Sequence, residues 1–141
     1  MAYEKNRNIQ DATYIGTFTL PATAANTTSC NTTMFDLGTT ITDAPESIEW
    51  QLEVGALSNT IAPAASTAGV DYSVEYATTS AFSTVTPIWH KNFVGTGSGV
   101  AATTIRGRLP SNCGRFVRAK VKIGTTCTDA SAVTATFRFL F

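Results

Sequence analysis

The chain has 141 residues, of which 43% are hydrophobic, 10% aromatic and only 14% charged, and its formal net charge is zero. This length fits one domain, and the composition argues against a coiled coil, a disordered tail and a compact basic nucleic-acid module. Threonine is the most frequent residue, with 25 copies. Its β-branched hydroxyl side chain suits the half-solvated surface of a β-sheet.

The N-terminal segment differs from the rest of the chain. Residues 1–11 are polar, mixed in charge and without hydrophobic periodicity, so we expect an N-terminal arm followed by one domain at 12–141. The first residues form no apolar signal-peptide core, and no window of the chain approaches 18 apolar residues. We therefore expect the protein to fold in a cytoplasm and to have no membrane partner.

Alternation of apolar and polar residues runs through most of the remaining chain. In 47–54, for example, Trp50 and Leu52 alternate with Glu49, Gln51 and Glu53. A period of two is typical of a strand with one buried and one exposed face. Strands are predicted at residues 14–20, 29–37, 47–54, 72–77, 85–90, 102–109, 117–123 and 133–141.

Two prolines qualify the predicted secondary structure. Pro87 predicts that 85–90 is an edge strand or contains a bulge. Residues 62–68 are rich in alanine, but Pro63 stands near their start and favours a loop over a helix. The predicted fold class is all-β, a single antiparallel β-sandwich or jelly roll of about eight strands.

Charge is divided unevenly along the chain. Residues 1–75 contain nine acids and two bases, and residues 76–141 contain one acid and eight bases. Either the two halves interleave and neutralise each other locally, or the subunit has an acidic and a basic face that orient a partner.

Six cations belong to two consecutive strand-like segments and would line one surface if those segments pair. A protein interface suits them, because arginine is enriched at interfaces and pairs well with carboxylates, and Glu49, Glu53 and Glu75 are a possible counterpart on a neighbour. The alternative is a solvated face with local cross-strand pairs. The six are Arg106, Arg108, Arg115, Arg118, Lys120 and Lys122.

The sequence offers little for catalysis. His90 is the single histidine and is predicted to be exposed in a loop, and 95–99 reads as a flexible glycine-rich loop rather than a phosphate cradle. On a strand Glu49 and Glu53 would lie about 13 Å apart, too far for a glycosidase pair. We expect no enzyme activity, no catalytic residue and no cofactor.

The cysteines also lack the spacing of a site. There are three, Cys30, Cys113 and Cys127, with no C-x-x-C pair. An odd number without that spacing favours buried free thiols over disulfides or a metal centre.

Three stretches together resemble a known family. The polar arm continues into 8–13 (NIQDAT), a strand ends at 33–38 (TMFDLG), and a late hairpin spans 106–118 (RGRLPSNCGRFVR), before a Gly-Thr-Thr turn and an alternating last strand. In this order they resemble the small jelly-roll capsid cement, or decoration, proteins of tailed bacteriophages.

The resemblance implies a structural virion protein on the capsid exterior, made in the host cytoplasm. Such proteins bind the phage head as dimers or trimers and clamp neighbouring major capsid subunits, without nucleic acid or membrane partners. The arm that this implies corresponds to 1–11, and a segment that orders on binding can wrap surface that a globular domain does not reach. The predicted partner-binding residues are the six cations above together with Tyr3, Glu4, Lys5 and Arg7.

A second hypothesis is a virion-associated or carbohydrate-binding β-sandwich module. Such a site needs aromatic side chains, and Trp50, Tyr72 and Trp89 are the candidates. Trp50 alternates with core positions and is predicted to be buried. Trp89, beside His90, is the better candidate for an exposed stacking platform.

Overall fold

The computed structural model describes residues 14–22, 29–38, 45–64 and 69–140, with the side chains of 29–31 excepted. Each of the eight predicted segments overlaps a strand, and a short 3-10 turn lies at Pro45–Ser47. The strands are β1 (Ile15–Thr19), β2 (Ser29–Asp36), β3 (Glu49–Val54), β4 (Val70–Ala77), β5 (Thr86–Phe93), β6 (Thr103–Arg108), β7 (Phe116–Ile123) and β8 (Thr134–Leu140).

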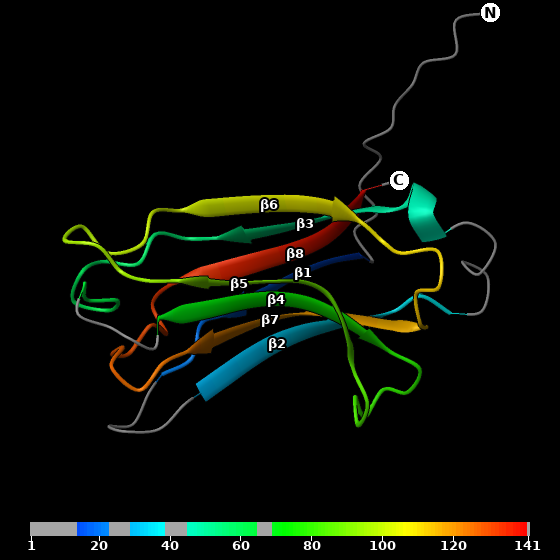
Figure 1. Ribbon diagram of the computed structural model, residues 1–141, viewed down its shortest axis with the longest axis horizontal. Coiled ribbons are helices and arrows are strands. Elements are labelled where there is room, and N and C mark those ends of the chain that lie inside the picture. The colour runs from blue at the N-terminus through cyan, green and yellow to red at the C-terminus, as the bar shows by residue number, and fades with distance from the viewer. Residues whose placement is uncertain (1–13, 23–28, 39–44, 65–68, 141) are drawn as a thin grey trace, which may run out of the picture.

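The strands form two four-stranded antiparallel sheets, in the orders β1-β8-β3-β6 and β2-β7-β4-β5. The first strand pairs with the eighth, the second with the seventh, the third with the sixth and the fourth with the fifth. This nested pairing is that of a jelly roll, in which one long hairpin is rolled into a sandwich. The two layers lie one above the other in Figure 1, and the predicted fold class is confirmed.

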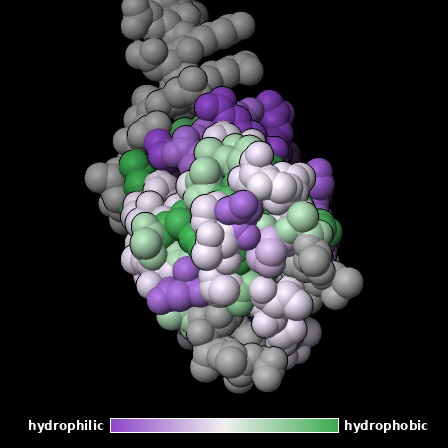
Figure 2. All heavy atoms as spheres, turned by 90° about the vertical axis from the view of Figure 1, so that its left-hand side faces the viewer, coloured by the Kyte–Doolittle hydropathy of each residue, from purple (hydrophilic) through white to green (hydrophobic). Residues whose placement is uncertain are grey.

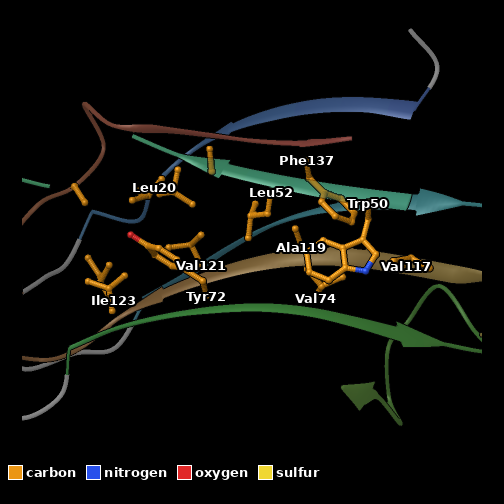
Figure 3. Close-up of a cluster of buried hydrophobic side chains, with 14 of the residues drawn as sticks. Leu20, Trp50, Leu52, Tyr72, Val74, Val117, Ala119, Val121, Ile123 and Phe137 are labelled. Carbon is orange, nitrogen blue, oxygen red and sulfur yellow. The ribbon is translucent and has the colours of Figure 1, made fainter. Parts of the chain in front are cut away.

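The space between the sheets is filled by apolar side chains. Trp50, Leu52 and Phe137 from one sheet meet Tyr72 and Val74 from the other, and each is at most 2% exposed (Figure 3). Trp50 is buried as predicted, and its Nε1 donates a hydrogen bond to the carbonyl oxygen of Arg108 at 3.3 Å. The alternation in the sequence therefore specifies which face of each strand points inward.

The edge strand β5 confirms the expectation placed on Pro87. Strand β5 pairs only with β4, and its register shifts between Val74 and Glu75, where Trp89 and Pro87 are the respective partners. Ile88 is therefore the extra residue of a β-bulge. A proline without an amide hydrogen and a bulge both discourage a further strand from adding to this edge.

Residues 95–99 differ from the predicted flexible loop. Thr96 and Gly99 exchange two backbone hydrogen bonds of 2.9 Å, which close a tight turn. A Cβ on Gly95 would lie 1.9 Å from the carbonyl oxygen of Ala62, and Gly99 has a φ of +84°. The glycines thus allow close backbone packing and a left-handed conformation, so the segment is a hydrogen-bonded turn rather than an open loop.

Candidate functional site: the outer faces of the two sheets

The six predicted cations lie on both sides of the sandwich. Strand β6 pairs with β3, and β7 pairs with β2 and β4, so the two basic segments belong to different sheets. The idea that they pair and line one surface is wrong, because the rolled topology carries the chain across the sandwich between β6 and β7. Arg106 and Arg108 belong to one sheet, and Arg118, Lys120 and Lys122 belong to the other, with Arg115 just before β7.

The two oppositely charged halves of the sequence neutralise each other within the chain. Glu49 accepts a hydrogen bond from Arg108 at 3.2 Å, and Glu53 accepts one from Arg138 at 2.7 Å. Glu75 pairs with Arg118. Each pair joins an acid from the first half to a base from the second, as in the interpretation of local neutralisation.

The β3 face is the outward side of β1-β8-β3-β6, which carries Glu49, Gln51, Glu53, Arg106 and Arg138. Gln51 is only 4% exposed, although it points away from the core, and its Nε2 donates to Glu53. Arg106 is exposed and has no ion pair with a residue in the described part of the chain. Most of this face is polar, and its carboxylates sit in water-accessible cross-strand pairs.

An open hollow of about 320 Å³ lies at one end of the β3 face. Glu53 is the single carboxylate in its lining and is already bonded to Arg138 and Gln51. The remaining lining offers hydroxyl groups and backbone, with no base beside a nucleophile, so we assign it no chemistry. The lining residues are Glu53, Val54, Gly55, Ala102, Thr103, Thr104, Thr134 and Thr136.

The β7 face is the outward side of β2-β7-β4-β5 and centres on Glu75. Glu75 is only 5% exposed, and its carboxylate bonds to Arg118, with the Lys120 Nζ 3.6 Å away. The Arg118 guanidinium in turn lies 4.2 Å from the centre of the Phe82 ring. A carboxylate this buried needs its paired cations, so Arg118 is held in one place.

A second ion pair lies beside this one. Asp36 accepts two hydrogen bonds from Arg115, at 2.6 and 2.7 Å, and a third from the amide of Gly38 at 2.8 Å. The bonds from Arg115, followed by that from Gly38, lower the pKa of Asp36 from 3.8 to about 2. The Arg115 guanidinium also lies 5.1 Å from the centre of the Phe116 ring.

The aromatic side chains considered for carbohydrate binding pack against other residues of this domain. Trp89 points to the interior side of β5, where its ring centre lies 6.3 Å from that of Trp50. His90 is exposed as predicted, but it lies on β5 rather than in a loop, and its Nε2 is 3.2 Å from Asp71 Oδ1. Asn92 donates to the same carboxylate oxygen at 2.9 Å. Trp89 is thus partly buried against the core rather than a fully open platform.

The structure describes two of the three cysteine side chains and none of the predicted arm. Burial raises the pKa of the Cys113 thiol to about 11, and Cys127 is buried. Within the described part of the chain, no group of three or more histidine, cysteine or carboxylate side chains could hold a metal ion. The side chain of Cys30 and the arm residues Tyr3, Glu4, Lys5 and Arg7 lie outside the described residues.

Sequence reasoning missed three side chains that shape these faces. Arg138 pairs with Glu53, Phe82 packs on Arg118, and Met34 is 45% exposed on β2 directly opposite Arg118. The alternation in 29–37 could have placed Met34 on the outer face, because Phe35 points inward. Phe82 lies in a Thr- and Ser-rich connection without periodicity, so no pattern indicated its position.

One end of the sandwich gives no competing candidate among its described residues. Figure 2 shows the end of the sandwich that carries the β3–β4, β5–β6 and β7–β8 connections. Residues of intermediate hydropathy cover most of the described surface in that view, and strongly hydrophilic residues occur in several separate places. In the described segments, no helix is long and apolar enough to cross a membrane.

Comparison with known proteins adds one similarity of fold. No family model and no curated protein matches the chain. Among solved structures, a chain of the naturally occurring empty particles (top component) of cowpea mosaic virus is similar, with a TM-score of 0.43 and 13% sequence identity. The similarity covers 91% of this chain and 83% of the viral chain. The jelly-roll assignment itself rests on the strand pairing described above.

Proposed function

We propose that this protein is a structural virion protein, a capsid cement or decoration protein that binds the outside of a phage head and clamps neighbouring major capsid subunits. The observation that carries the proposal is the filled interior of a jelly roll. Side chains such as Trp50, Leu52, Phe137 and Tyr72 occupy the space where other sandwiches and barrels hold a ligand. Function is then expected at the surface, as in a protein that acts by binding other proteins.

The two outer faces support a binding role over a catalytic one. Their carboxylates are engaged by cations across the strands, which gives rigid surfaces with fixed charge rather than a reactive base. The order of sequence motifs that resembles phage cement proteins supports the same role. Fold alone does not separate capsid-associated jelly rolls from lectin-like ones. The packing of Trp89 against Trp50 therefore counts against the carbohydrate-binding alternative.

The proposal includes self-association and an arm. We infer that the protein binds the shell as a dimer or trimer and that residues 1–11 extend along neighbouring subunits. Clamping two subunits needs contacts that reach beyond one globular domain, and an arm supplies them at the entropic cost of ordering on binding.

Copy number on particles tests the proposal. A lysate of the source is fractionated by sedimentation, and this protein is quantified against the major shell subunit in each fraction. We expect co-sedimentation with capsids at a fixed ratio to the shell subunit. A few copies per particle would instead indicate a vertex or tail protein, and recovery only as free protein would contradict the proposal.

Deletion of residues 1–11 tests the arm separately. The truncated protein is expected to keep the thermal unfolding transition of the full chain and to bind capsids more weakly. Full-strength binding by the truncated protein would remove the arm from the proposal while leaving the domain in it.

A further inference from the structure

One surface of the molecule combines the exposed Met34 and two partly exposed phenylalanines with two paired guanidinium groups. We name it the β7 patch, and it comprises Met34, Phe82, Arg115, Phe116 and Arg118. Met34 lies opposite Arg118 in the β2–β7 register, and Asp36 lies opposite Phe116, so the strand residues are direct neighbours. Phe82 joins them from the β4–β5 connection, the green segment at the lower right of Figure 1.

Both arginines of the β7 patch are paired with carboxylates of the same face. Arg118 is bonded to the nearly buried Glu75, and Arg115 makes two parallel bonds to Asp36. Each guanidinium also lies over an aromatic ring, at 4.2 Å for Phe82 and 5.1 Å for Phe116. Side chains fixed in this way lose little freedom when a partner covers them, which favours tight binding.

The backbone at Phe82 is strained. Within the described ranges, Phe82 is the one non-glycine residue with positive φ, at 48°, and its amide donates to the carbonyl of Thr79 at 3.2 Å. This conformation costs a bulky residue free energy, whereas glycine would adopt it freely. Strain of this kind is concentrated at functional sites, and here its visible result is an aromatic ring placed over Arg118.

The composition and charge of the β7 patch indicate the kind of partner. Arginine, methionine and aromatic residues are enriched where protein interfaces are fully buried. Glu75 faces both Arg118 and Lys120, and the exposed Lys122 forms no ion pair with a described residue, so positive charge is in excess at the rim. The β3 face offers no comparable group of methionine, aromatic and arginine side chains. By the strand register its outward positions are mainly threonines, Gln51 and charged residues, with Ile15 and the buried Leu140 as the apolar exceptions.

We propose that the β7 patch is the docking surface for a protein partner that presents carboxylates around an apolar centre. The inference rests on the proposed function, under which that partner is a capsid subunit and the β3 face stays free. The apolar centre covers Met34 and Phe82, and the carboxylates meet Lys120 and Lys122 at the rim. Because Asp36 and Glu75 already engage the guanidinium groups, the β7 patch suits a mixed apolar and acidic protein surface better than a phosphate backbone.

Binding to capsids of the source that lack this protein tests the assignment. The full chain and three variants are titrated against such capsids, and bound protein is measured by co-sedimentation. Met34→Glu places a carboxylate at the centre of the β7 patch, and Phe82→Gly removes the ring while keeping a residue that tolerates positive φ. Arg106→Glu is the contrasting variant, an exposed cation on the β3 face without an ion pair to a described residue. The sequence also predicts that Arg106 binds a partner, but with the β7 patch as the docking surface it has no such role. Circular dichroism melts verify that each variant is folded.

We expect Met34→Glu to weaken binding by about tenfold or more and Phe82→Gly by several-fold, with Arg106→Glu within about twofold of the wild type. Wild-type binding that only Arg106→Glu weakens would overturn the inference and leave the cement proposal standing. Absence of wild-type binding would overturn both. If Met34→Glu instead dissociates the isolated oligomer in light scattering and leaves capsid binding intact, the occupant is a second copy, and the inference is overturned.

Discussion

The two outer faces use the same cross-strand pairing of acid and base at different depths. On the β7 face the side chain of Glu75 is 7% exposed, whereas those of Glu49 and Glu53 on the β3 face are 38% and 40% exposed. Exposed pairs contribute little to stability, because water and salt screen them. A nearly buried carboxylate is different, since its desolvation must be offset by partners that stay in place. The buried carboxylate therefore holds its cations rigidly on the β7 face, whereas the pairs of the β3 face stay accessible to water.

Neutralising the buried carboxylate should destabilise the fold more than any other single change on these faces. Glu75→Gln leaves Arg118 and Lys120 without their anion, and we expect the free energy of unfolding to fall by about 3 kcal/mol. This lies at the low end for a broken buried pair, because both cations keep some contact with water. The matched change Glu49→Gln should cost less than about 1 kcal/mol. Urea unfolding of both variants measures the contrast, and equal losses would show that depth is irrelevant.

The β3 side is held instead by packing at its edge strand. Gly107 on β6 lies against the indole of Trp50, and a Cβ there would be 2.5 Å from Trp50 Cζ2. Gly107→Ala should displace the buried ring and weaken its bond to the Arg108 carbonyl, at a cost of about 2 kcal/mol. Gly97→Ala is the control, because nothing lies within 4 Å of that position. A thermal melt of Gly107→Ala as stable as that of Gly97→Ala would contradict the packing argument.

The exposed Asp36–Arg115 pair beside Glu75 should make the stability of the protein depend on pH. The folded pKa of Asp36 is lowered from 3.8 to about 2, so its contribution to stability is complete above pH 4 and disappears as the pH falls toward 2. Asp36→Asn should therefore melt below the wild type at pH 6, and the gap in melting temperature should close between pH 4 and pH 2. A gap that stays constant over this range would show that the carboxylate is not responsible.

Strands such as β3 and β7 could be predicted from the sequence because one of their faces is buried in the core. In β3 and β7 the alternation is complete, and the observed strands match the predicted segments to within a residue or two. Pro87 was informative for a covalent reason, since a ring without an amide hydrogen fits only an edge or a bulge. These signals are local and need no knowledge of the partner strand.

The arrangement of the cations could not be predicted in the same way. Whether β6 and β7 pair depends on how the hairpin rolls, which is a property of the whole chain and not of either segment. Phe82 illustrates the same limit, because a positive φ in a Thr-rich connection leaves no periodic pattern. The carboxylates Glu49 and Glu75 were visible in the sequence, but their different burial was not.

The inner faces of the same two sheets differ in how their buried polar atoms are satisfied. Trp50 on β3 satisfies its polar atom through the Arg108 carbonyl, whereas the Tyr72 hydroxyl on β4 is buried without a hydrogen bond to any described residue. Burial raises the pKa of Tyr72 above its usual value, so the group stays a neutral phenol.

Tyr72→Phe removes an unsatisfied buried group while keeping the ring that packs on Phe93, with centres 4.8 Å apart. We expect the free energy of unfolding to stay the same or to rise by up to about 1 kcal/mol. Trp50→Phe is the contrasting variant, because it removes both a satisfied hydrogen bond and volume, and it should lower stability. Urea unfolding distinguishes the two. A clear loss of stability in Tyr72→Phe would mean that the hydroxyl is bonded in solution, for example to a buried water, and that both inner faces satisfy their polar atoms.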